Sequence, residues 1–319
     1  MELFLNFVLL IVGMVLLIKG ADFFVEGSSN VAKYFKIPSL IIGLTLVSIG
    51  TSLPETSVSI SSAIQNKPDL SFGNVFGSNI FNVLVVIGCC SLIKPMVVSK
   101  GIIKYDLPIY FGIIIVLTLF AFAFTPFVIV WYEALILFLI FLGYMTFVLY
   151  RAKKNPEPEV ESTDAEPKKT KPMWLNIIFI IGGLAAIVFG GHLVVEHASS
   201  IARHFGMSEL LVGLTIVAVG TSLPELVTSM VATKKGEVDI AVGNAIGSCI
   251  FNIILIVGLS GMISDIPLQP TSYIDLIIMS IAALLIFVFA FKKLKVNRIQ
   301  GLILVLIYIA YLAFIIYRN

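Results

Sequence analysis

Two glutamates lie within long apolar segments, inside the same six-residue sequence. Gly-Thr-Ser-Leu-Pro-Glu occupies residues 50–55 and occurs again, letter for letter, at residues 220–225. An ionisable residue inside a bilayer costs at least about 2.5–3.5 kcal/mol on insertion scales, so it normally faces a partner or a water-filled cavity. Two carboxylates in matching surroundings, Glu55 and Glu225, therefore predict a cation site in the middle of a membrane protein.

The residues before each glutamate offer further oxygen atoms. Thr51 and Ser52 precede Glu55 by four and three positions and share its helix face, and Ser48 extends this face by another turn. Pro54 has no N–H and disrupts the helix one turn back, which frees backbone carbonyls to act as ligands where they line a cavity. The second copy offers the corresponding residues Ala218, Thr221 and Ser222.

A second pair of blocks predicts polar stripes on the next helix of each half. Residues 73–82 read Gly-Asn-Val-Phe-Gly-Ser-Asn-Ile-Phe-Asn, and residues 243–252 read Gly-Asn-Ala-Ile-Gly-Ser-Cys-Ile-Phe-Asn. Polar residues recur every four positions on one face of each helix: Asn74, Ser78 and Asn82, then Asn244, Ser248 and Asn252. A single Ser or Thr more often bonds its own helix than a ligand. Four polar stripes together with two carboxylates favour a cation site.

The oxygen-rich set indicates a hard cation. Calcium takes about six to eight oxygen ligands in flexible geometry, whereas transition metals prefer nitrogen or sulfur. We expect the three cysteines to be small core residues: Cys89, Cys90 and Cys249. We expect the three histidines to be interfacial or helix-packing residues: His192, His197 and His204. Glu26 and Glu196, which match at the same offset, fit either an ion entrance or an interfacial position.

Composition indicates that a bilayer surrounds these segments. Hydrophobic residues make up 59% of the 319 residues, charged residues make up 13%, and the mean hydropathy is +1.06. A soluble domain carries about 25% charged residues. We therefore predict an all-α polytopic membrane protein with ten transmembrane helices, near 3–27, 38–64, 70–93, 102–124, 127–150, 174–198, 208–233, 239–263, 272–291 and 298–317.

An internal repeat organises these helices. Shifted by 170 residues, 20–93 aligns with 190–263 without a gap, and 28 of the 74 positions are identical. Five helices is an odd number, so the second copy enters the membrane from the opposite side, as in many secondary transporters. The predicted units are a first five-helix repeat 1–150 (repeat block 43–88), a disordered cytoplasmic linker 151–172, and a second five-helix repeat 173–319 (repeat block 213–258). With both termini outside, the inner loops carry seventeen Lys and Arg residues and the outer loops three.

The paired blocks resemble the two α-repeats of the cation/calcium exchanger superfamily, in its sodium/calcium branch. The resemblance covers the whole chain and implies that the first and sixth helices slide across a core of α-repeat helices. It implies that calcium binds Glu55 and Glu225 with the carbonyls of Thr51 and Thr221. Sodium would use the same glutamates with Ser52, Ser78, Ser222, Ser248 and the carbonyls of Ser48 and Ala218. Asn82 and Asn252 would complete the centre. The two copies depart from each other where Ser48 matches Ala218 and Asn79 matches Cys249.

The expected function is an antiporter of the plasma membrane, exchanging sodium for calcium by alternating access. We expect no catalytic activity, no cofactor, no nucleic acid and no obligate protein partner. A proton-coupled antiporter is disfavoured because that branch typically lacks Thr-Ser-Leu-Pro before its glutamate. Potassium-dependent relatives typically carry Asp where this chain has Asn252. A passive calcium channel stays open as an alternative. An intramembrane hydrolase would need a nucleophile and a base, and no such pair repeats.

Overall fold

The computed structural model describes residues 2–65, 69–154, 171–207, 216, 218–268, 272–291 and 294–318. Within these ranges the chain is helical apart from four two-residue strands. Eight helices are long and apolar enough to cross a membrane, and the bent pair Ser39–Thr51 and Leu53–Ile64 makes a ninth candidate span. The protein is therefore an all-α membrane protein, as predicted.

The first half contains helices α1 to α8 and four π-helical turns, in which each backbone hydrogen bond spans one residue more than in an α-helix. Its elements are α1 (Glu2–Phe35), α2 (Ser39–Ile42), η1 (Gly43–Val47), α3 (Ser48–Thr51), α4 (Leu53–Ile64), α5 (Asp69–Phe81), η2 (Asn82–Val86), α6 (Ile87–Ile93), β1 (Met96–Val97), η3 (Ile102–Asp106), α7 (Leu107–Leu119), η4 (Phe120–Phe124), β2 (Val128–Ile129) and α8 (Trp131–Lys154).

The second half has a similar order of helices, without π-helical turns on either side of α15 in the residues that the structure describes. Its described elements are α9 (Met173–His204), α11 (Ala218–Gly220), α12 (Leu223–Lys235), α13 (Val238–Phe251), η6 (Asn252–Val257), α14 (Gly258–Ile263), β3 (Ile266–Pro267), α15 (Ser272–Phe291), β4 (Lys295–Val296) and α16 (Arg298–Arg318).

Nine of the predicted spans coincide with these helices, but the first and sixth are longer than predicted. α1 continues to Phe35 and α9 to His204. In the last turn of α1, Lys33 pairs with Glu237, so its charge does not end the helix. The seventh predicted span, 208–233, lies partly outside the described residues, and α12 forms its second part. Most of the predicted linker, 155–170, also lies outside them.

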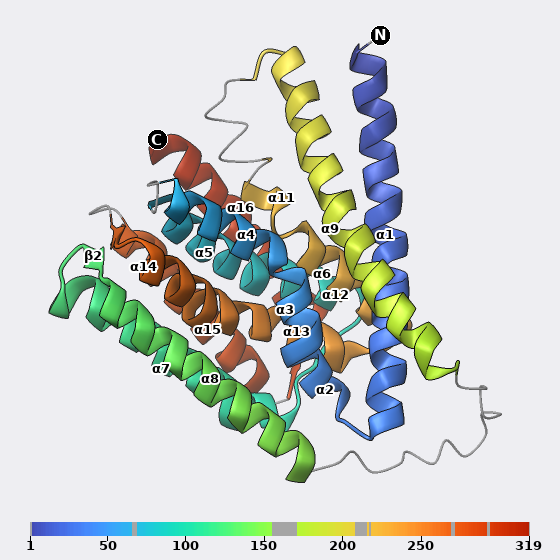
Figure 1. Ribbon diagram of the computed structural model, residues 1–319, viewed down its shortest axis with the longest axis horizontal. Coiled ribbons are helices and arrows are strands. Elements are labelled where there is room, and N and C mark those ends of the chain that lie inside the picture. The colour runs from blue at the N-terminus through green and yellow to red at the C-terminus, as the bar shows by residue number, and fades with distance from the viewer. Residues whose placement is uncertain are drawn as a thin grey trace.

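α1 and α9 lie side by side along one edge of the molecule (Figure 1). Glycines let their backbones approach closely: a Cβ added at Gly13 would lie 2.9 Å from the carbonyl oxygen of Gly190, and one at Gly20 would lie 2.8 Å from that of Gly183. The residue numbers rise along one helix as they fall along the other, so the two helices run antiparallel. The 170-residue offset relates the two contacts to each other, because Gly13 corresponds to Gly183 and Gly20 corresponds to Gly190.

The polar blocks lie on the innermost helices. In the segments Val238–Ile263 and Ser71–Ile93, 78% and 72% of the residues in the most apolar stretch are buried, whereas α1 and α16 bury 17%. Gly243 and Gly247 face Leu40 and Leu44 so closely that an added Cβ would lie 2.7 and 3.0 Å from their respective carbonyl oxygens. The two glycines of the second block therefore let this helix approach the one before Glu55 closely. Among the described atoms, a Cβ at Gly73 or Gly77 would meet nothing within 4 Å.

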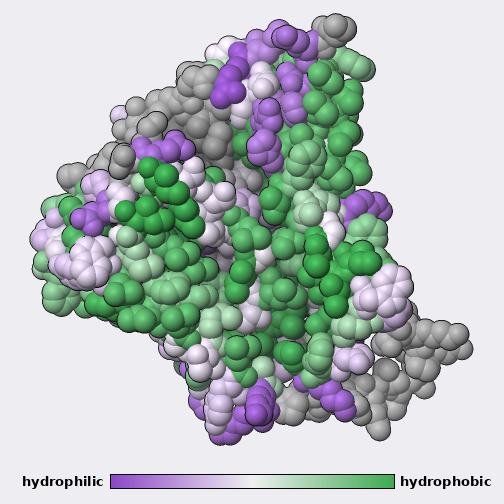
Figure 2. Space-filling model, in the orientation of Figure 1, coloured by the Kyte–Doolittle hydropathy of each residue, from purple (hydrophilic) through white to green (hydrophobic). Residues whose placement is uncertain are grey.

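The outer surface is apolar, as a bilayer requires. Figure 2 shows hydrophobic residues over most of the visible face, with hydrophilic residues gathered toward its ends.

Two short antiparallel strand pairs, which the all-helical prediction did not include, join the halves: Met96 pairs with Val296, and Ile129 with Ile266. Met96 and Ile266 are again 170 residues apart.

Candidate cation site

A helix break positions each glutamate. The axes of α3 and α4 meet at 46° around Ser52, whose backbone (φ −83°, ψ 9°) leaves the helical region. Ser222 has nearly the same conformation (φ −93°, ψ 7°) before α12. Pro54 cannot donate to the carbonyl of Gly50, which maintains the break. Glu55 and Glu225 thus lie in the first turns of α4 and α12, where the helix dipole favours a negative charge.

The two carboxylates are braced by serines of the opposite half. The Ser222 hydroxyl donates to Glu55 Oε1 over 3.1 Å, and the Ser52 hydroxyl donates to Glu225 Oε1 over 3.0 Å. Each glutamate is therefore bonded to the residue that lies three positions before the other one. Both glutamates are completely buried. The structure brings the two repeated sequences together into one site.

Two asparagines of the polar stripes hold the glutamate backbones. The Asn74 side chain donates to the carbonyl of Glu55 (3.2 Å) and to the Ser59 hydroxyl (3.0 Å). Asn244 does the same in the second half, with the Glu225 carbonyl (3.4 Å) and the hydroxyl of Ser229 (2.9 Å). Both asparagines were predicted to lie on the polar stripes. Their serine partners were not predicted, although Ser59 and Ser229 match at the 170-residue offset.

The threonine side chains bond these asparagines across the halves. Thr51 donates to Asn244 Oδ1 over 3.0 Å, and Thr221 donates to Asn74 Oδ1 over 3.5 Å. The hydroxyls of Thr51 and Thr221 are therefore occupied in helix packing. Their backbone carbonyls were the predicted calcium ligands, and the helix breaks lie immediately after them.

Several buried oxygen atoms at this level have no hydrogen-bond partner within the described protein: Glu55 Oε2, Glu225 Oε2, Asn82 Oδ1, Asn252 Oδ1 and Ser248 Oγ. A buried polar atom without a hydrogen-bond partner destabilises the folded protein, so each such atom needs a physical explanation. Ser78 lies in the same network, because its hydroxyl oxygen lies 3.0 Å from that of Ser222. These atoms form an oxygen-only set of the kind that a calcium or sodium ion prefers.

Asn82 and Asn252 each begin a π-helical turn, η2 and η6 respectively. Such turns shift the backbone hydrogen bonds by one residue and are frequent at functional sites. The turns were not predicted, because no residue pattern in a single sequence distinguishes them from an α-helix.

Ser48 lies before the helix break at Ser52, and its carbonyl already accepts from the backbone N–H of Ser52 (3.0 Å). Ala218 begins α11, just before the second break.

The other ionisable residues lie elsewhere. The described part of the chain has no group of three or more His, Cys, Asp and Glu residues that could hold a metal ion. The three cysteines are free thiols, and Cys90 and Cys249 are buried, as predicted for core residues. His197 bonds Asn6 of α1 (2.9 Å), which confirms a helix-packing role. Glu26 pairs with Lys171 and Lys235, and Glu196 with His192.

Comparison with known proteins identifies the family of this chain. Residues 5–150 and 175–317 match the family of the sodium/calcium exchanger protein. The chain is 39% identical to the putative antiporter CaxA of Alkalimonas amylolytica over 95% of this chain and 96% of the relative. It is 32% identical to the sodium/calcium exchanger MaX1 of Methanosarcina acetivorans over 98% and 99%.

A solved structure of the sodium-calcium exchanger NCX_Mj has the same fold, with a TM-score of 0.82 and 30% identity over 97% of this chain and 98% of that one. The family model, the full-length relatives and the shared fold agree with each other. The chain is therefore a multi-pass membrane protein of the sodium/calcium exchanger family, a family of cation/calcium antiporters.

Proposed function

We propose that this protein exchanges sodium ions for a calcium ion by alternating access at the site between Glu55 and Glu225. One observation carries the proposal: two buried carboxylates from opposite halves are each bonded by a serine of the other half, and each keeps one oxygen atom without a partner among the described residues. Two carboxylates offset the charge of one divalent ion, which would otherwise be very costly to bury.

The proposed calcium ligands are Glu55 and Glu225 with the carbonyls of Thr51 and Thr221. The proposed sodium ligands are both glutamates, Ser52, Ser78, Ser222, Ser248 and the carbonyls of Ser48 and Ala218, with Asn82 and Asn252 at the centre. The unpartnered oxygens of Ser248, Asn82 and Asn252 support this assignment. The hydroxyls of Ser52 and Ser222 donate to carboxylates, and their lone pairs are free to contact a cation at the same time.

We propose that ten helices form two inverted five-helix repeats, with both termini outside and residues 151–172 in the cytoplasm. The antiparallel contact of α1 with α9 supports inversion, because its glycines match at the 170-residue offset. The hydrogen bonds of Asn74 and Asn244 repeat at this offset as well. The surplus of Lys and Arg in the predicted inner loops supports the orientation.

The charge of the site makes the exchange electrogenic. The two carboxylates contribute −2, so a bound calcium ion leaves the site neutral, whereas the three sodium ions that the family resemblance implies leave it at +1. The asparagines at the centre are neutral and add no third negative charge. Sodium is therefore the favoured coupling ion, and a potassium-dependent or proton-coupled cycle is the alternative.

The test is calcium-45 uptake into proteoliposomes that hold a sodium, a potassium or a proton gradient, each imposed separately. We expect uptake to follow the sodium gradient alone. Uptake without any counter-gradient would indicate a passive channel, and uptake that follows protons or needs potassium would replace the proposed coupling ion.

Glu55→Gln and Glu225→Gln should both abolish the exchange, and Glu133→Gln is a matched control. Glu133 is also buried, but its carboxylate accepts from the backbone N–H of Val130 at the start of α8. Gln300 makes the same bond to the N–H of Asn297 at the start of α16. The fold therefore already uses a glutamine at the corresponding place, and the control variant should fold and transport.

A further inference from the structure

Asn79 and Cys249 occupy the same place in the two polar blocks, and theirs is the one difference between the blocks that changes a polar side chain. Both residues are completely buried. They contact one another across the halves: the Asn79 side chain donates to the carbonyl of Cys249 over 3.1 Å, and the Cys249 thiol donates to the carbonyl of Asn79 over 3.7 Å. The two side chains then differ in what else they do.

The partners of Asn79 determine the orientation of its amide group. The carbonyl of Cys249 can only accept a hydrogen bond, so Asn79 must turn Nδ2 toward it. Asn79 Oδ1 then faces the other way and accepts from Asn252 Nδ2 over 3.1 Å. Asn252 must in turn direct its own Oδ1 away from Asn79, and this oxygen is buried with no partner in the part of the chain that the structure describes. The Cys249 carbonyl, the Asn79 amide and the Asn252 amide thus form a chain of hydrogen bonds that allows the Asn252 side chain one orientation.

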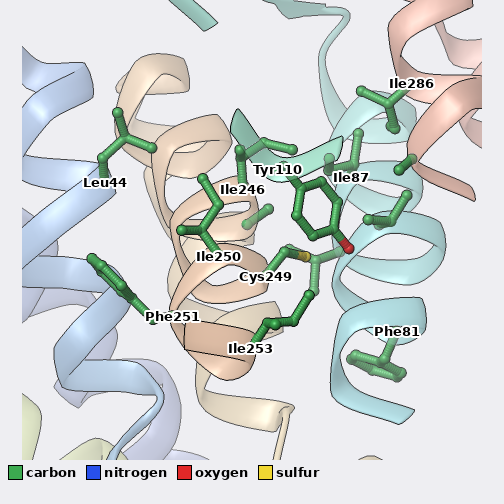
Figure 3. Packing of buried hydrophobic residues seen from close by; sticks show 14 of the residues in the cluster. Leu44, Phe81, Ile87, Tyr110, Ile246, Cys249, Ile250, Phe251, Ile253 and Ile286 are labelled. Carbon is green, nitrogen blue, oxygen red and sulfur yellow. The ribbon is translucent and has the colours of Figure 1, made fainter. Parts of the chain in front are cut away.

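Asn82, the counterpart of Asn252, receives no such bond. Its Nδ2 and Oδ1 are both buried without a partner in the described protein. The Cys249 thiol is short, is a weak donor and bonds a backbone carbonyl. Figure 3 shows Cys249 among Ile246, Ile250, Ile253 and Tyr110, in the apolar packing of the core. One half of the site therefore has an oriented amide, and the other half has an amide that is free to turn.

We propose that Asn79 is a positioning residue that directs the Asn252 oxygen toward the cation and excludes a carboxylate from position 252. This rests on the proposed function, in which Asn252 is a cation ligand. A carboxylate at position 252 would place one of its oxygen atoms against Asn79 Oδ1. Both atoms are acceptors, and no proton lies between them. Turning the Asn79 amide would only move the conflict to the carbonyl of Cys249. Asn79 thereby maintains the site at two negative charges.

The first experiment compares Asn79→Leu with Cys249→Ala in the reconstituted full-length protein. Leucine has a similar volume but cannot orient Asn252, and a neutral hydrogen bond of this kind accounts for about a fivefold change in an equilibrium constant. We expect the KM for calcium to rise about fivefold in Asn79→Leu with a smaller change in maximal rate. In Cys249→Ala, which removes the matched side chain, the KM should stay within about twofold of the wild type.

Asn79→Cys keeps the test decisive if the leucine variant does not fold, because the other half already accommodates cysteine at this position. It should show the same rise in KM. A wild-type KM in a folded Asn79→Leu or Asn79→Cys protein would overturn the positioning role.

A double-mutant cycle tests the exclusion of a carboxylate. Asn252→Asp should weaken calcium-dependent stabilisation against heat in detergent more strongly in the wild-type background than in Asn79→Leu, where the conflicting oxygen is gone. Equal effects in the two backgrounds would refute the proposal.

Asn252→Ala distinguishes a failure of the positioning role of Asn79 from a failure of the proposed cation site. If it impairs exchange while Asn79→Leu does not, the positioning role alone is wrong. If Asn252→Ala and the glutamate variants all transport normally, the proposed site is wrong, and the positioning role with it.

Discussion

An ion-pair cluster joins the C-terminal half of α1 to α12 and to the segment that follows it. Lys235 Nζ lies 2.9 Å from Asp22 Oδ1 and 3.7 Å from Glu26 Oε2, and Lys33 Nζ lies 3.1 Å from Glu237 Oε1. In the orientation we propose, this is the cytoplasmic end. The position 170 residues before Lys235 is Gln65, whose amide donates to Ser61 in its own helix. The cluster therefore holds α1 at one end of the molecule, and the uncharged Gln65 does not reproduce the ion pairs of Lys235 in the other half.

If α1 slides during alternating access, these pairs exist in one state and break in the other. A partly exposed ion pair contributes about 0.2–1 kcal/mol. Lys235 makes two, so Lys235→Gln should weaken the pinned state by roughly 0.4–2 kcal/mol, which is about a 2- to 30-fold shift in the equilibrium between the states. The shift should shrink at high salt, because the pairs are partly exposed.

The assay is the ratio of the KM values for calcium measured from the two sides of oriented membrane vesicles. Lys235→Gln should change this ratio about 2- to 30-fold. Lys234→Gln removes the same charge from the neighbouring residue, which makes no ion pair with the residues that the structure describes, and should leave the ratio near the wild-type value. A wild-type ratio in Lys235→Gln would refute the reasoning, as would an equal change in both variants.

Three further predictions concern the site. Glu55→Gln and Glu225→Gln should each abolish sodium-driven calcium-45 uptake by folded protein, because an amide leaves half of the calcium charge uncompensated; near-normal uptake would contradict the site. Exchange should respond to membrane potential by about 2.3 kcal/mol per net charge moved at 100 mV, and indifference to a valinomycin-clamped potential would show that the charge accounting is wrong. Exchange should not require potassium, since Asn82 and Asn252 provide no third carboxylate. Flux that is silent until potassium is added would exclude this.

The fold class and the residues of the candidate site were predictable from the chain itself. A helix in a bilayer must satisfy its backbone internally and present apolar side chains, so its sequence shows long apolar runs. The few polar residues in those runs are therefore conspicuous, and Glu55, Glu225 and the polar stripes stand out for this reason. The 170-residue repeat relates the two halves without any knowledge of their packing.

Tertiary structure decided which of these polar groups bond each other. Helical periodicity places Ser52 on the same face as Glu55, yet its hydroxyl bonds Glu225, 173 residues away in the chain. The register of two crossing helices determines which residue becomes the partner, and the local sequence does not show this register. The same holds for the Asn79 amide, which orients Asn252 from the opposite half. The π-helical turns at Asn82 and Asn252 also depend on this packing, because a change of one residue in a backbone hydrogen bond leaves the side-chain pattern unaltered.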